Sequence, residues 1–491
     1  MGSPLDVVLV NPGGKEPIYG ALANEYAAVE TPLWLALLAA YLRERGLTVA
    51  IIDADAQQLG PREAVRRAVE LQPLLCAVGA IGGNPSVSST PKMPAVRAVL
   101  EELRQQSTNV RSVIFGIHPS GVPERTLREE PVDFLCRGET FLCITDLVMA
   151  FRNGGDTGNI QGLWYKQNDK VVDRGWARQL QDLDVLPLAA WDLLPMDRYR
   201  AHNWHCFGHL EDRASYAMVY TSLGCPYNCS YCNIHALYGG GGIRFRSAGK
   251  VLEEIDLLVR KYGVRNFKFV DELFVVNPRR MDEVCLGLAE RKYDINIWVY
   301  ARIDTVNENI LRKLFRAGVR WIAYGIEGAN TEVRKGVAKG RFDREKILQV
   351  IRQTNEAGIH VIGNYMFGLP DDDMSTMQET LDLAVELNCE YANFYVTMAY
   401  PGAALYDTAV RDALPLPSCW EGYSQFNRHT VPLPSKYLSS AEILRFRDNA
   451  FMQYFGSSRY QDMILRKFGQ PTLDHVRGLL THKLPRVLLG D

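Results

Sequence analysis

Short apolar runs alternate with amphipathic segments over most of the chain, and this alternation limits the possible folds more than any other feature. The runs have the length of strands, whereas apolar residues recur at spacing three and four between them, which is the period of a helix. Such an order indicates βαβ units with parallel sheets. The alternation forms two arrays, and at about 150 residues per domain the 491 residues correspond to three folding units.

The first array covers residues 1–150 and predicts an α/β domain with a Rossmann-like, doubly wound sheet. Sheets of this kind bind ligands at the carboxyl ends of their strands. Four strands are followed by loops of small residues, NPGG, GGNPSVSST, GIHPSG and RGET, which let a large ligand approach the backbone. Any one of these loops could be an ordinary turn, but four on one edge favour a ligand site. The predicted strands are Asp6–Val10, Val49–Asp53, Leu74–Ile81, Val110–Gly116 and Val132–Cys136, and the predicted helices are Leu33–Arg45, Arg62–Leu71 and Met93–Gln106.

The second array covers residues 217–404 and contains six β/α units. Six units predict a partial (β/α)6 barrel with its chemistry at the carboxyl ends of the strands. Residues 151–216 are expected to form a connector with a small hairpin, and residues 405–491 a helical C-terminal region. The predicted strands are Ala217–Leu223, Phe267–Asp271, Ile297–Arg302, Trp321–Ile326, Val361–Phe367 and Ala392–Met398, and the predicted helices are Ala248–Tyr262, Pro278–Arg291, Glu308–Ala317, Arg344–Ala357 and Ser375–Leu387.

Composition and charge exclude several classes of protein. A hydrophobic content of 47% with 23% charged residues excludes a disordered or fibrous chain. Lys and Arg number 55 against 57 Asp and Glu, so no basic excess indicates a nucleic-acid partner. The longest apolar run, Pro32–Leu42, is shorter than the ~20 residues of a membrane-spanning helix, so we expect no membrane partner. The N-terminal sequence MGSPLDVVLV lacks the features of a secretory signal, and we therefore expect a cytoplasmic protein.

Three cysteines form a tight cluster, Cys225, Cys229 and Cys232, within GCPYNCSYCNI directly after the first predicted strand of the second array. Three thiolates on so short a loop can hold one polynuclear metal cluster. A 4Fe-4S cluster with three protein ligands leaves one iron open to a substrate or cofactor. The alternative is a zinc site, for which His235 could supply the fourth ligand.

The spacing Cys-x3-Cys-x-aromatic-Cys, completed by Tyr231, resembles the signature of the radical S-adenosylmethionine superfamily. The resemblance implies that the open iron chelates the amino and carboxylate groups of S-adenosylmethionine. Reductive cleavage would then yield methionine and a 5'-deoxyadenosyl radical, with an electron donor such as flavodoxin or ferredoxin as partner.

Further positions can be matched to the superfamily strand by strand. Glu272 in FVDELF stands where the superfamily binds the methionine amino group, although Asp-Glu here replaces the commoner Gly-Gly-Glu. Arg302 in YARID would pair with the methionine carboxylate, and Glu327 in YGIEGAN resembles the ribose-contacting position. Asn364 and Tyr395 would line the same mouth of the barrel.

Each of these positions also has a structural explanation. Glu272 could be an acidic residue at a helix N-terminus, stabilised by the helix dipole. Arg302 and Glu327 could form an ion pair with each other. Tyr395 could be a core residue.

The order of parts resembles the cobalamin-binding radical enzymes related to the anaerobic magnesium-protoporphyrin cyclase, over about residues 5–405. The resemblance implies that residues 1–150 bind cobalamin. The sequence NPGG stands where many cobalamin domains carry the Asp-x-His-x-x-Gly motif whose histidine ligates cobalt, so we expect no such ligand; His118 in GIHPS is expected to form hydrogen bonds. Contacts to the corrin ring and its nucleotide tail are assigned to Asn84, Ser86, Gly116, His118, Gly138 and Glu139.

The segment HNWHCFGH, just before the barrel, has metal-binding residue types at short spacing, namely His202, His205, Cys206 and His209. No regular zinc pattern fits it. We expect it to form a connector wall near the substrate cavity.

These resemblances predict a cobalamin-dependent radical S-adenosylmethionine methyltransferase that acts on an unactivated carbon of a small molecule. One S-adenosylmethionine would methylate the reduced cobalamin, and a second would give the radical that activates the substrate. The alternative reaction is an oxidative cyclisation or a rearrangement, whose product would not be heavier by one CH2 group. An iron-sulfur electron-transfer protein is the alternative class, and it would form no 5'-deoxyadenosine. The sequence leaves open the identity of the substrate and the oligomeric state.

Overall fold

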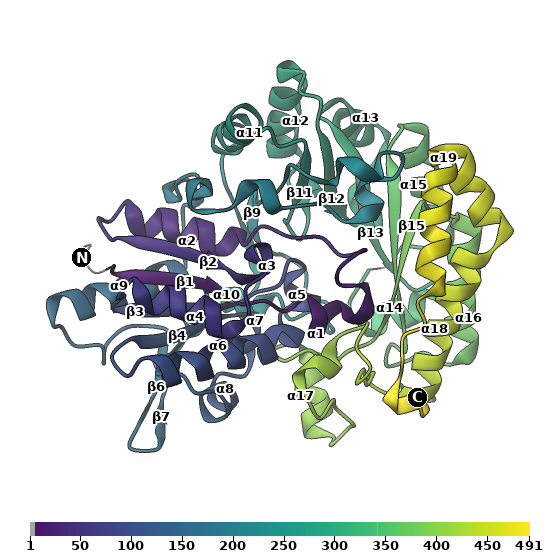
Figure 1. Ribbon diagram of the computed structural model, residues 1–491. Coiled ribbons are helices and arrows are strands. Elements are labelled where there is room, and N and C mark those ends of the chain that lie inside the picture. Colours follow the sequence, from purple (N-terminus) through teal and green to yellow (C-terminus); the bar gives the residue numbers. More distant parts are fainter. Residues whose placement is uncertain (1–4, 341) are drawn as a thin grey trace.

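Two sheets with parallel cores organise the molecule, one for each array of the sequence (Figure 1). The computed structural model describes residues 5–340 and 342–491, so the first four residues of the predicted N-terminal domain lie outside the described residues. The first sheet lies beside the barrel sheet, and the C-terminal helices lie at the far side of the barrel (Figure 1).

The first sheet has seven strands in the order β2-β1-β3-β4-β5-β6-β7. The first five are parallel, as predicted, while β6 and β7 are the hairpin expected in the connector and extend the sheet antiparallel. The order of the parallel strands reverses at β1, which pairs with β2 on one side and β3 on the other, and ligands of doubly wound sheets bind at such a reversal. The strands are β1 (Val7–Asn11), β2 (Val49–Asp53), β3 (Leu75–Ala80), β4 (Arg111–Gly116), β5 (Phe134–Cys136), β6 (Leu163–Gln167) and β7 (Lys170–Val172).

Helices cover this sheet because their apolar faces match it. The clearest case is α2 (Leu33–Arg43), in which every residue but the last is buried. A helix that the sequence pattern did not reveal, α9 (Thr140–Asn153), packs against α2. The remaining helices of this half are α1 (Lys15–Tyr19), α3 (Ala54–Gln57), α4 (Pro61–Glu70), α5 (Pro85–Ser88), α6 (Met93–Gln106), α7 (Ile117–Gly121) and α8 (Pro123–Glu129).

The second sheet has six parallel strands in the order β15-β14-β13-β12-β11-β8, which is the predicted partial barrel. Its strands are β8 (Tyr216–Val219), β11 (Asn266–Phe269), β12 (Asn296–Ala301), β13 (Val319–Glu327), β14 (His360–Phe367) and β15 (Tyr391–Val396). Two further strands, β9 (Ser222–Cys225) and β10 (Gly242–Phe245), form a separate ribbon. The helices are α10 (His235–Tyr238), α11 (Ala248–Tyr262), α12 (Pro278–Arg291), α13 (Glu308–Arg316), α14 (Thr331–Gly336), α15 (Arg344–Glu356) and α16 (Met374–Leu387).

The prediction of one strand over residues 217–223 is wrong, because the chain leaves the barrel sheet after β8. The carboxylate of Asp271 accepts hydrogen bonds from the backbone N–H groups of Thr221 and Ser222, at 2.6 and 3.0 Å. These donors are therefore withdrawn from the barrel ladder, and the chain continues as β9, which pairs antiparallel with β10. The consequence is that Cys225 ends a ribbon strand that projects from the barrel.

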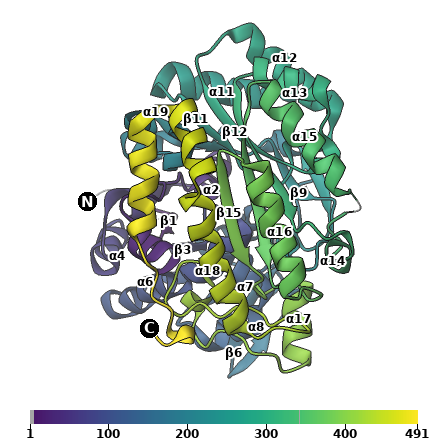
Figure 2. The same ribbon diagram turned by 90° about the vertical axis from the view of Figure 1, so that its right-hand side faces the viewer.

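The C-terminal region is helical only in part. Figure 2 shows α18 (Ser440–Gly456) and α19 (Ser458–Thr481) beside β15 and α16. The segment between α17 (Ala404–Arg411) and α18 contains no α-helix, because LPLP and VPLP sequences supply prolines that cannot continue one. This segment reaches back to the first domain, where Trp420 packs against His118. Among the described helices, none is both long and apolar enough to cross a membrane.

Candidate functional site

The three clustered cysteines open into one cavity at the carboxyl ends of the barrel strands, with a volume of about 210 Å³. Each thiol is partly exposed to this cavity, whereas most of the other cysteines are buried. Burial raises the pKa of Cys225 to about 11 and that of Cys232 to about 12, so without a metal both side chains are protonated thiols. Thiols that coordinate a metal lose these protons, and this donor set suits iron.

The geometry of the cysteine loop differs from that of a zinc site. Thiolates that share one zinc ion lie about 3.8 Å apart. In the described part of the chain the three sulfur atoms are not gathered within 4.8 Å of one another. His235 is also engaged elsewhere, since its Nε2 lies 2.7 Å from the carbonyl oxygen of Tyr227 and its Nδ1 lies 3.2 Å from that of Gly240. The loop therefore fits a polynuclear cluster with three cysteine ligands better than one zinc ion.

The residues predicted to bind S-adenosylmethionine line the same cavity, together with two residues from the N-terminal half. They come from the cysteine loop, from the ends of β11 to β15 and from the loop after β3. The set is Tyr231, Glu272, Arg302, Glu327, Asn364, Tyr395, Asn84 and Ser86.

Glu327 ends β13 in an unusual backbone conformation, with φ at +61° and an irregular register against β14. A residue with a side chain adopts this region at a cost, and such strain occurs most often at functional sites. Its carboxylate accepts a hydrogen bond from the Tyr231 hydroxyl at 2.9 Å and lies 2.5 Å from the Lys339 ammonium. Burial is the largest influence and lowers the pKa of Lys339, but Glu327 and Cys229 together raise this pKa above its usual value. The three groups form one buried polar unit beside the cysteines.

Arg302 follows β12 and is held by Asp304 through two hydrogen bonds of 2.9 Å. Its guanidinium also lies over the ring of Tyr227, 3.9 Å from the centroid, and donates to the carbonyl oxygen of Lys339. The interpretation of Arg302 and Glu327 as partners of each other is therefore wrong, because each has a different partner. Both remain available on the cavity wall.

Glu272 lies in the loop after β11 and has no hydrogen-bond partner among the described residues. Burial, and next the neighbouring Asp271, raise the pKa of Glu272 to about 7. The interpretation as a helix N-terminal acid is wrong, because α12 begins only at Pro278 and is capped by Asn277. An unpartnered carboxyl group that faces the cysteine cavity is suited to accept hydrogen bonds from a bound ammonium group.

Sequence reasoning missed several residues that line this cavity. Lys339 follows the short helix α14, which itself contains two basic residues. Nothing in the sequence therefore distinguished Lys339 as a residue of the cavity. Gln425 comes from the C-terminal region, about 200 residues from the cysteines, and holds both backbone polar groups of Val396. The other missed residues are Tyr227, Tyr300, Tyr400, Met366 and Met398.

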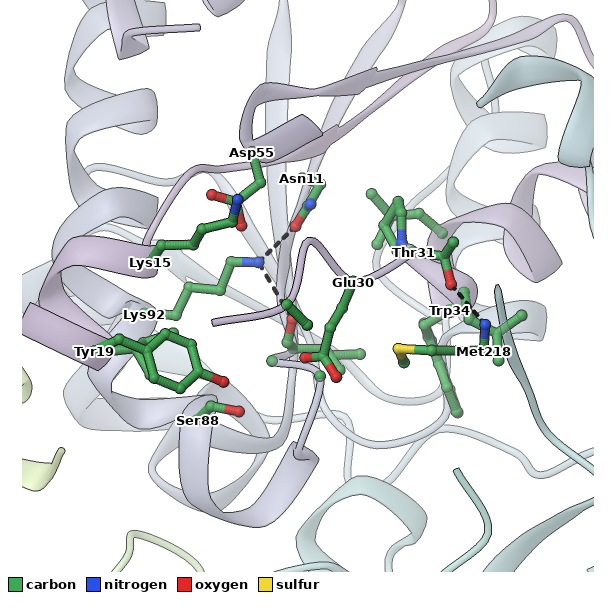
Figure 3. A pocket seen from close by; sticks show the side chains of 18 of the residues that line it. Asn11, Lys15, Tyr19, Glu30, Thr31, Trp34, Asp55, Ser88, Lys92 and Met218 are labelled. Atoms are coloured by element: carbon green, nitrogen blue, oxygen red, sulfur yellow. Dashed lines mark hydrogen bonds between the residues drawn. The ribbon is translucent and has the colours of Figure 1, made fainter. Parts of the chain in front are cut away.

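A smaller cavity of about 60 Å³ lies at the carboxyl ends of β1 and β3, where the strand order reverses. Figure 3 shows Lys15, Asp55 and Lys92 gathered there, with the Lys92 ammonium 2.5 Å from Asn11 Oδ1 and 3.3 Å from the carbonyl oxygen of Ile81. Burial lowers the pKa of Lys92 and raises that of Asp55. This cavity is too small for cobalamin as a whole, but ligands of doubly wound sheets bind at such a reversal, and its polar side chains are suited to contact one amide or phosphate group of such a ligand.

The six residues assigned to cobalamin separate into two groups. Asn84 and Ser86 reach the cysteine cavity, and the Ser86 hydroxyl donates to Asn233 Oδ1 at 2.7 Å and lies 3.8 Å from Cys232 Sγ. The loop after β3 thus links the first domain to the cysteine loop.

The other four residues, Gly116, His118, Gly138 and Glu139, line neither of these two cavities. His118 is buried, with its ring 4.4 Å from that of Trp420, and burial lowers its pKa to about 3. Glu139 forms an ion pair with Arg244 at 2.6 Å. A contact between these four residues and cobalamin remains a prediction from the sequence.

The segment HNWHCFGH does not converge on one point. His202 lines a third cavity, of about 130 Å³, between the barrel strands and the N-terminal half. His205 is buried beside Trp298, and the Cys206 thiol donates to Asn266. His209 is exposed near Glu211 and Asp212. Of the four metal-binding residue types, only His202 lines a cavity, next to Asn203 and Trp204 of the same segment. That this cavity takes the substrate remains a prediction.

Comparison with known proteins agrees with this division of the molecule. Residues 219–384 match the radical SAM superfamily, and residues 19–142 match the B12 binding domain. An uncharacterized methyltransferase of Pyrococcus horikoshii is 28% identical, with 92% of each chain covered. The anaerobic magnesium-protoporphyrin IX monomethyl ester cyclase of Cereibacter sphaeroides is 26% identical over 89% of this chain and 69% of its own.

Among solved structures, the fold is similar to that of the radical S-adenosylmethionine methyltransferase TsrM from Kitasatospora setae, determined with cobalamin and a [4Fe-4S] cluster bound. The TM-score is 0.70 at 17% identity, covering 92% of this chain and 89% of that one. The chain thus combines a B12 binding domain with a radical SAM domain, which is the domain combination of the cobalamin-binding radical S-adenosylmethionine enzymes. Its cofactors are a 4Fe-4S cluster, S-adenosylmethionine and cobalamin.

Proposed function

We propose that the protein is a methyltransferase that moves a methyl group from S-adenosylmethionine, by way of cobalamin, to an unactivated carbon of a small molecule. The observation that carries the proposal is that the cysteine loop, the S-adenosylmethionine residues and the loop after β3 all open into one cavity. The three cysteines would hold the cluster. The cofactors, when bound, supply the electron transfer, the radical and the methyl carrier.

The chain's own residues would bind and orient S-adenosylmethionine. Glu272 would accept hydrogen bonds from its ammonium group, and Arg302 would face its carboxylate. Glu327, held by Tyr231 and Lys339, would bind the ribose hydroxyls. The aromatic and methionine side chains of the cavity would exclude water from the radical.

Relatives support a methyl-transfer reaction. Besides the Pyrococcus protein, they include the bacteriochlorophyllide d C-8(2)-methyltransferase of Chlorobaculum tepidum, which is 22% identical over 64% of this chain. The similarity to the cyclase favours oxidative cyclisation as a second candidate. The substrate would be a small molecule, the partner an electron donor such as flavodoxin or ferredoxin, and the location the cytoplasm.

The two candidates differ in the products they form from S-adenosylmethionine. The protein, loaded anaerobically with cluster and cobalamin, is incubated with S-adenosylmethionine and dithionite, and the products are separated by mass spectrometry. A methyltransferase forms both S-adenosylhomocysteine and 5'-deoxyadenosine. Formation of 5'-deoxyadenosine without S-adenosylhomocysteine would contradict the proposal and favour the cyclase, and formation of neither would contradict both.

A further inference from the structure

The third cavity adjoins the cysteine cavity on the inner side of the barrel. Its volume is about 130 Å³, and both cavities share the side chains of Tyr300, Tyr395, Gln425, Asn84 and Val87. A molecule in the third cavity would therefore lie beside the place of S-adenosylmethionine. This position suits the substrate of the proposed methyl transfer, on which the following inference rests.

The walls of the third cavity are largely aromatic. Trp298 and Tyr300 come from β12, Tyr391 and Tyr395 from β15, and Trp204 from the connector. Aromatic faces favour apolar and ring-shaped groups by area burial and stacking. The cavity thus offers a ring-sized space whose walls are mostly apolar but also carry uncharged polar side chains, among them Asn84, Ser424 and Gln425.

Phenol groups on these walls, among them those of Tyr19, Tyr300 and Tyr395, have no hydrogen-bond partner among the described residues. Burial raises the pKa of each phenol above its usual value, so each stays protonated. The Asn393 amide donates to Asn364 Oδ1 at 2.8 Å. The free phenols can donate to a hydroxyl or carbonyl oxygen of a bound molecule.

The cavity contains two charged side chains, and they neutralise each other. The Lys268 ammonium donates to Glu30 Oε1 and to the carbonyl oxygen of Gly83, both at 2.7 Å, and lies 4.9 Å from the centre of the Trp298 ring. Two of its three protons are thereby bonded, and the Trp298 ring lies within cation–π distance. The histidine on this wall, His202, is held uncharged because burial lowers its pKa to about 4.

The backbone of the first domain secures this ion pair. A Cβ atom at Gly83 would lie 1.3 Å from a carboxylate oxygen of Glu30, so only glycine lets the loop after β3 approach the carboxylate. Glu30 itself belongs to the loop before α2 and is drawn beside the smaller cavity in Figure 3. Both halves of the molecule therefore hold the pair together, and the pair leaves no net charge on the cavity wall.

We propose that the third cavity accepts the reacting part of the substrate only as an uncharged, ring-sized apolar group bearing hydroxyl or carbonyl oxygen, and that the Glu30–Lys268 pair enforces this specificity. A charged group in the cavity would find no counterion and would lose its hydration. A zwitterion such as an amino acid would have to break the pair in order to bind.

The test uses four single-ring probes with different charges: benzamide, benzoate, benzylammonium and phenylalanine. Binding to the protein loaded with cluster, cobalamin and S-adenosylmethionine, without reductant, is measured by ligand-observed NMR. Benzamide should bind about tenfold more tightly than each of the others. Equal or tighter binding of a charged probe or of phenylalanine would overturn the proposal, as would failure of all four to bind.

Two variants test the role of the ion pair. Lys268→Met leaves the Glu30 charge unpaired and should shift the preference towards benzylammonium, whereas Glu30→Gln should shift it towards benzoate. The double variant should again prefer benzamide, and the exposed Lys436→Met serves as the control. An unchanged ranking in both single variants would overturn the role of the pair. Because the assay needs no turnover, its failure is distinguishable from failure of the proposed methyl transfer.

Discussion

The Lys339 ammonium lies 2.5 Å from Glu327 Oε1, and both side chains are less than one-tenth exposed. Lys339 follows α14, whereas Glu327 ends β13, so the pair joins a loop to the strained end of a barrel strand. A buried charge that loses its partner costs much more than an exposed one. The pair therefore both shapes the cavity wall and makes it sensitive to single substitutions.

The first prediction concerns this pair. Lys339→Met should lower the free energy of unfolding by about 3–5 kcal/mol, because it leaves the Glu327 carboxylate buried and unpaired. The double variant with Glu327→Gln should recover part of the loss, since the neutral amide still accepts the Tyr231 hydroxyl. Thermal unfolding measures both. The control is Lys436→Met, which removes an exposed pair with Asp371 and should lower the free energy of unfolding far less, because solvent screens the pair. Equal losses in the two lysine variants would contradict the prediction.

The second prediction concerns the pH dependence of Glu272. Only the ionised carboxylate accepts strong hydrogen bonds from an ammonium group, so S-adenosylmethionine affinity should rise as the pH rises through the pKa of about 7. A hydrogen bond to a charged group contributes ~1.5–3 kcal/mol, so Glu272→Gln should weaken the binding of S-adenosylmethionine by about tenfold to 100-fold. The variant should also make this affinity independent of pH near 7. Equilibrium dialysis on the cluster-loaded protein measures this. A Gln variant with wild-type affinity would show that Glu272 is structural.

The raised pKa of Glu272 also affects stability. Because the folded chain holds this proton more tightly than the unfolded chain, its contribution to stability is present below the ordinary pKa of 4.5 and is lost as the pH rises to about 7. The measurement is denaturant unfolding of the cofactor-free protein at several pH values. In Glu272→Gln, the free energy of unfolding should no longer contain this decrease between pH 4.5 and 7.

The third prediction concerns the cluster. Replacing Cys225, Cys229 and Cys232 together by Ala should remove the iron, the sulfide and the broad visible absorption, because no other described thiol lines the cavity. Iron and sulfide analysis after anaerobic reconstitution measures the result. Cys285→Ala, at a buried cysteine outside the cavity, is the matched control. Retention of four iron and four sulfide by the triple variant would refute the assignment.

The fourth prediction concerns the link between the two halves. The Ser86 hydroxyl donates to Asn233 Oδ1 but also lies 3.8 Å from Cys232 Sγ, and we expect its proton to turn to the thiolate when a cluster is bound. Hydrogen bonds to cluster sulfur atoms raise the reduction potential. Ser86→Ala should therefore lower the potential by ~20–40 mV, equivalent to 0.5–1 kcal/mol for one electron. A redox titration followed by electron paramagnetic resonance measures the shift, with Ser418→Ala as a distant control. An unchanged reduction potential in Ser86→Ala would show that the Ser86 hydroxyl forms a hydrogen bond only with Asn233.

The fifth prediction concerns His118. Its ring packs against Trp420 and its Nδ1 lies 3.3 Å from the Thr90 hydroxyl, so it is expected to stay off the cobalt. The electron paramagnetic resonance spectrum of bound cob(II)alamin should be the same in the wild type and in His118→Ala. A nitrogen splitting that disappears in the variant would identify an axial histidine and contradict the prediction.

Local patterns were sufficient for much of the fold. The period of the apolar residues defined α6 and α11 with their exact ends, and the spacing of Cys225, Cys229 and Cys232 indicated the metal cluster, because both signals lie within a few neighbouring residues. Glu272, Arg302 and Glu327 were assigned to one site through the resemblance to the radical S-adenosylmethionine superfamily, and they do line one cavity, because loops after successive parallel strands meet at one edge.

Other features depended on contacts between distant segments. The turn of the chain out of the barrel before Cys225 depends on Asp271, about 45 residues away, and the pairing of Lys268 with Glu30 joins residues 238 positions apart. The same holds for Lys339 beside Glu327 and for His118 against Trp420. A charge or a ring in the sequence does not reveal its partner, because burial and distance arise only when the two halves pack together. The sequence by itself thus determined the two β/α arrays and the cysteine motif, and the tertiary structure decided which charges are neutralised and what the cavity can bind.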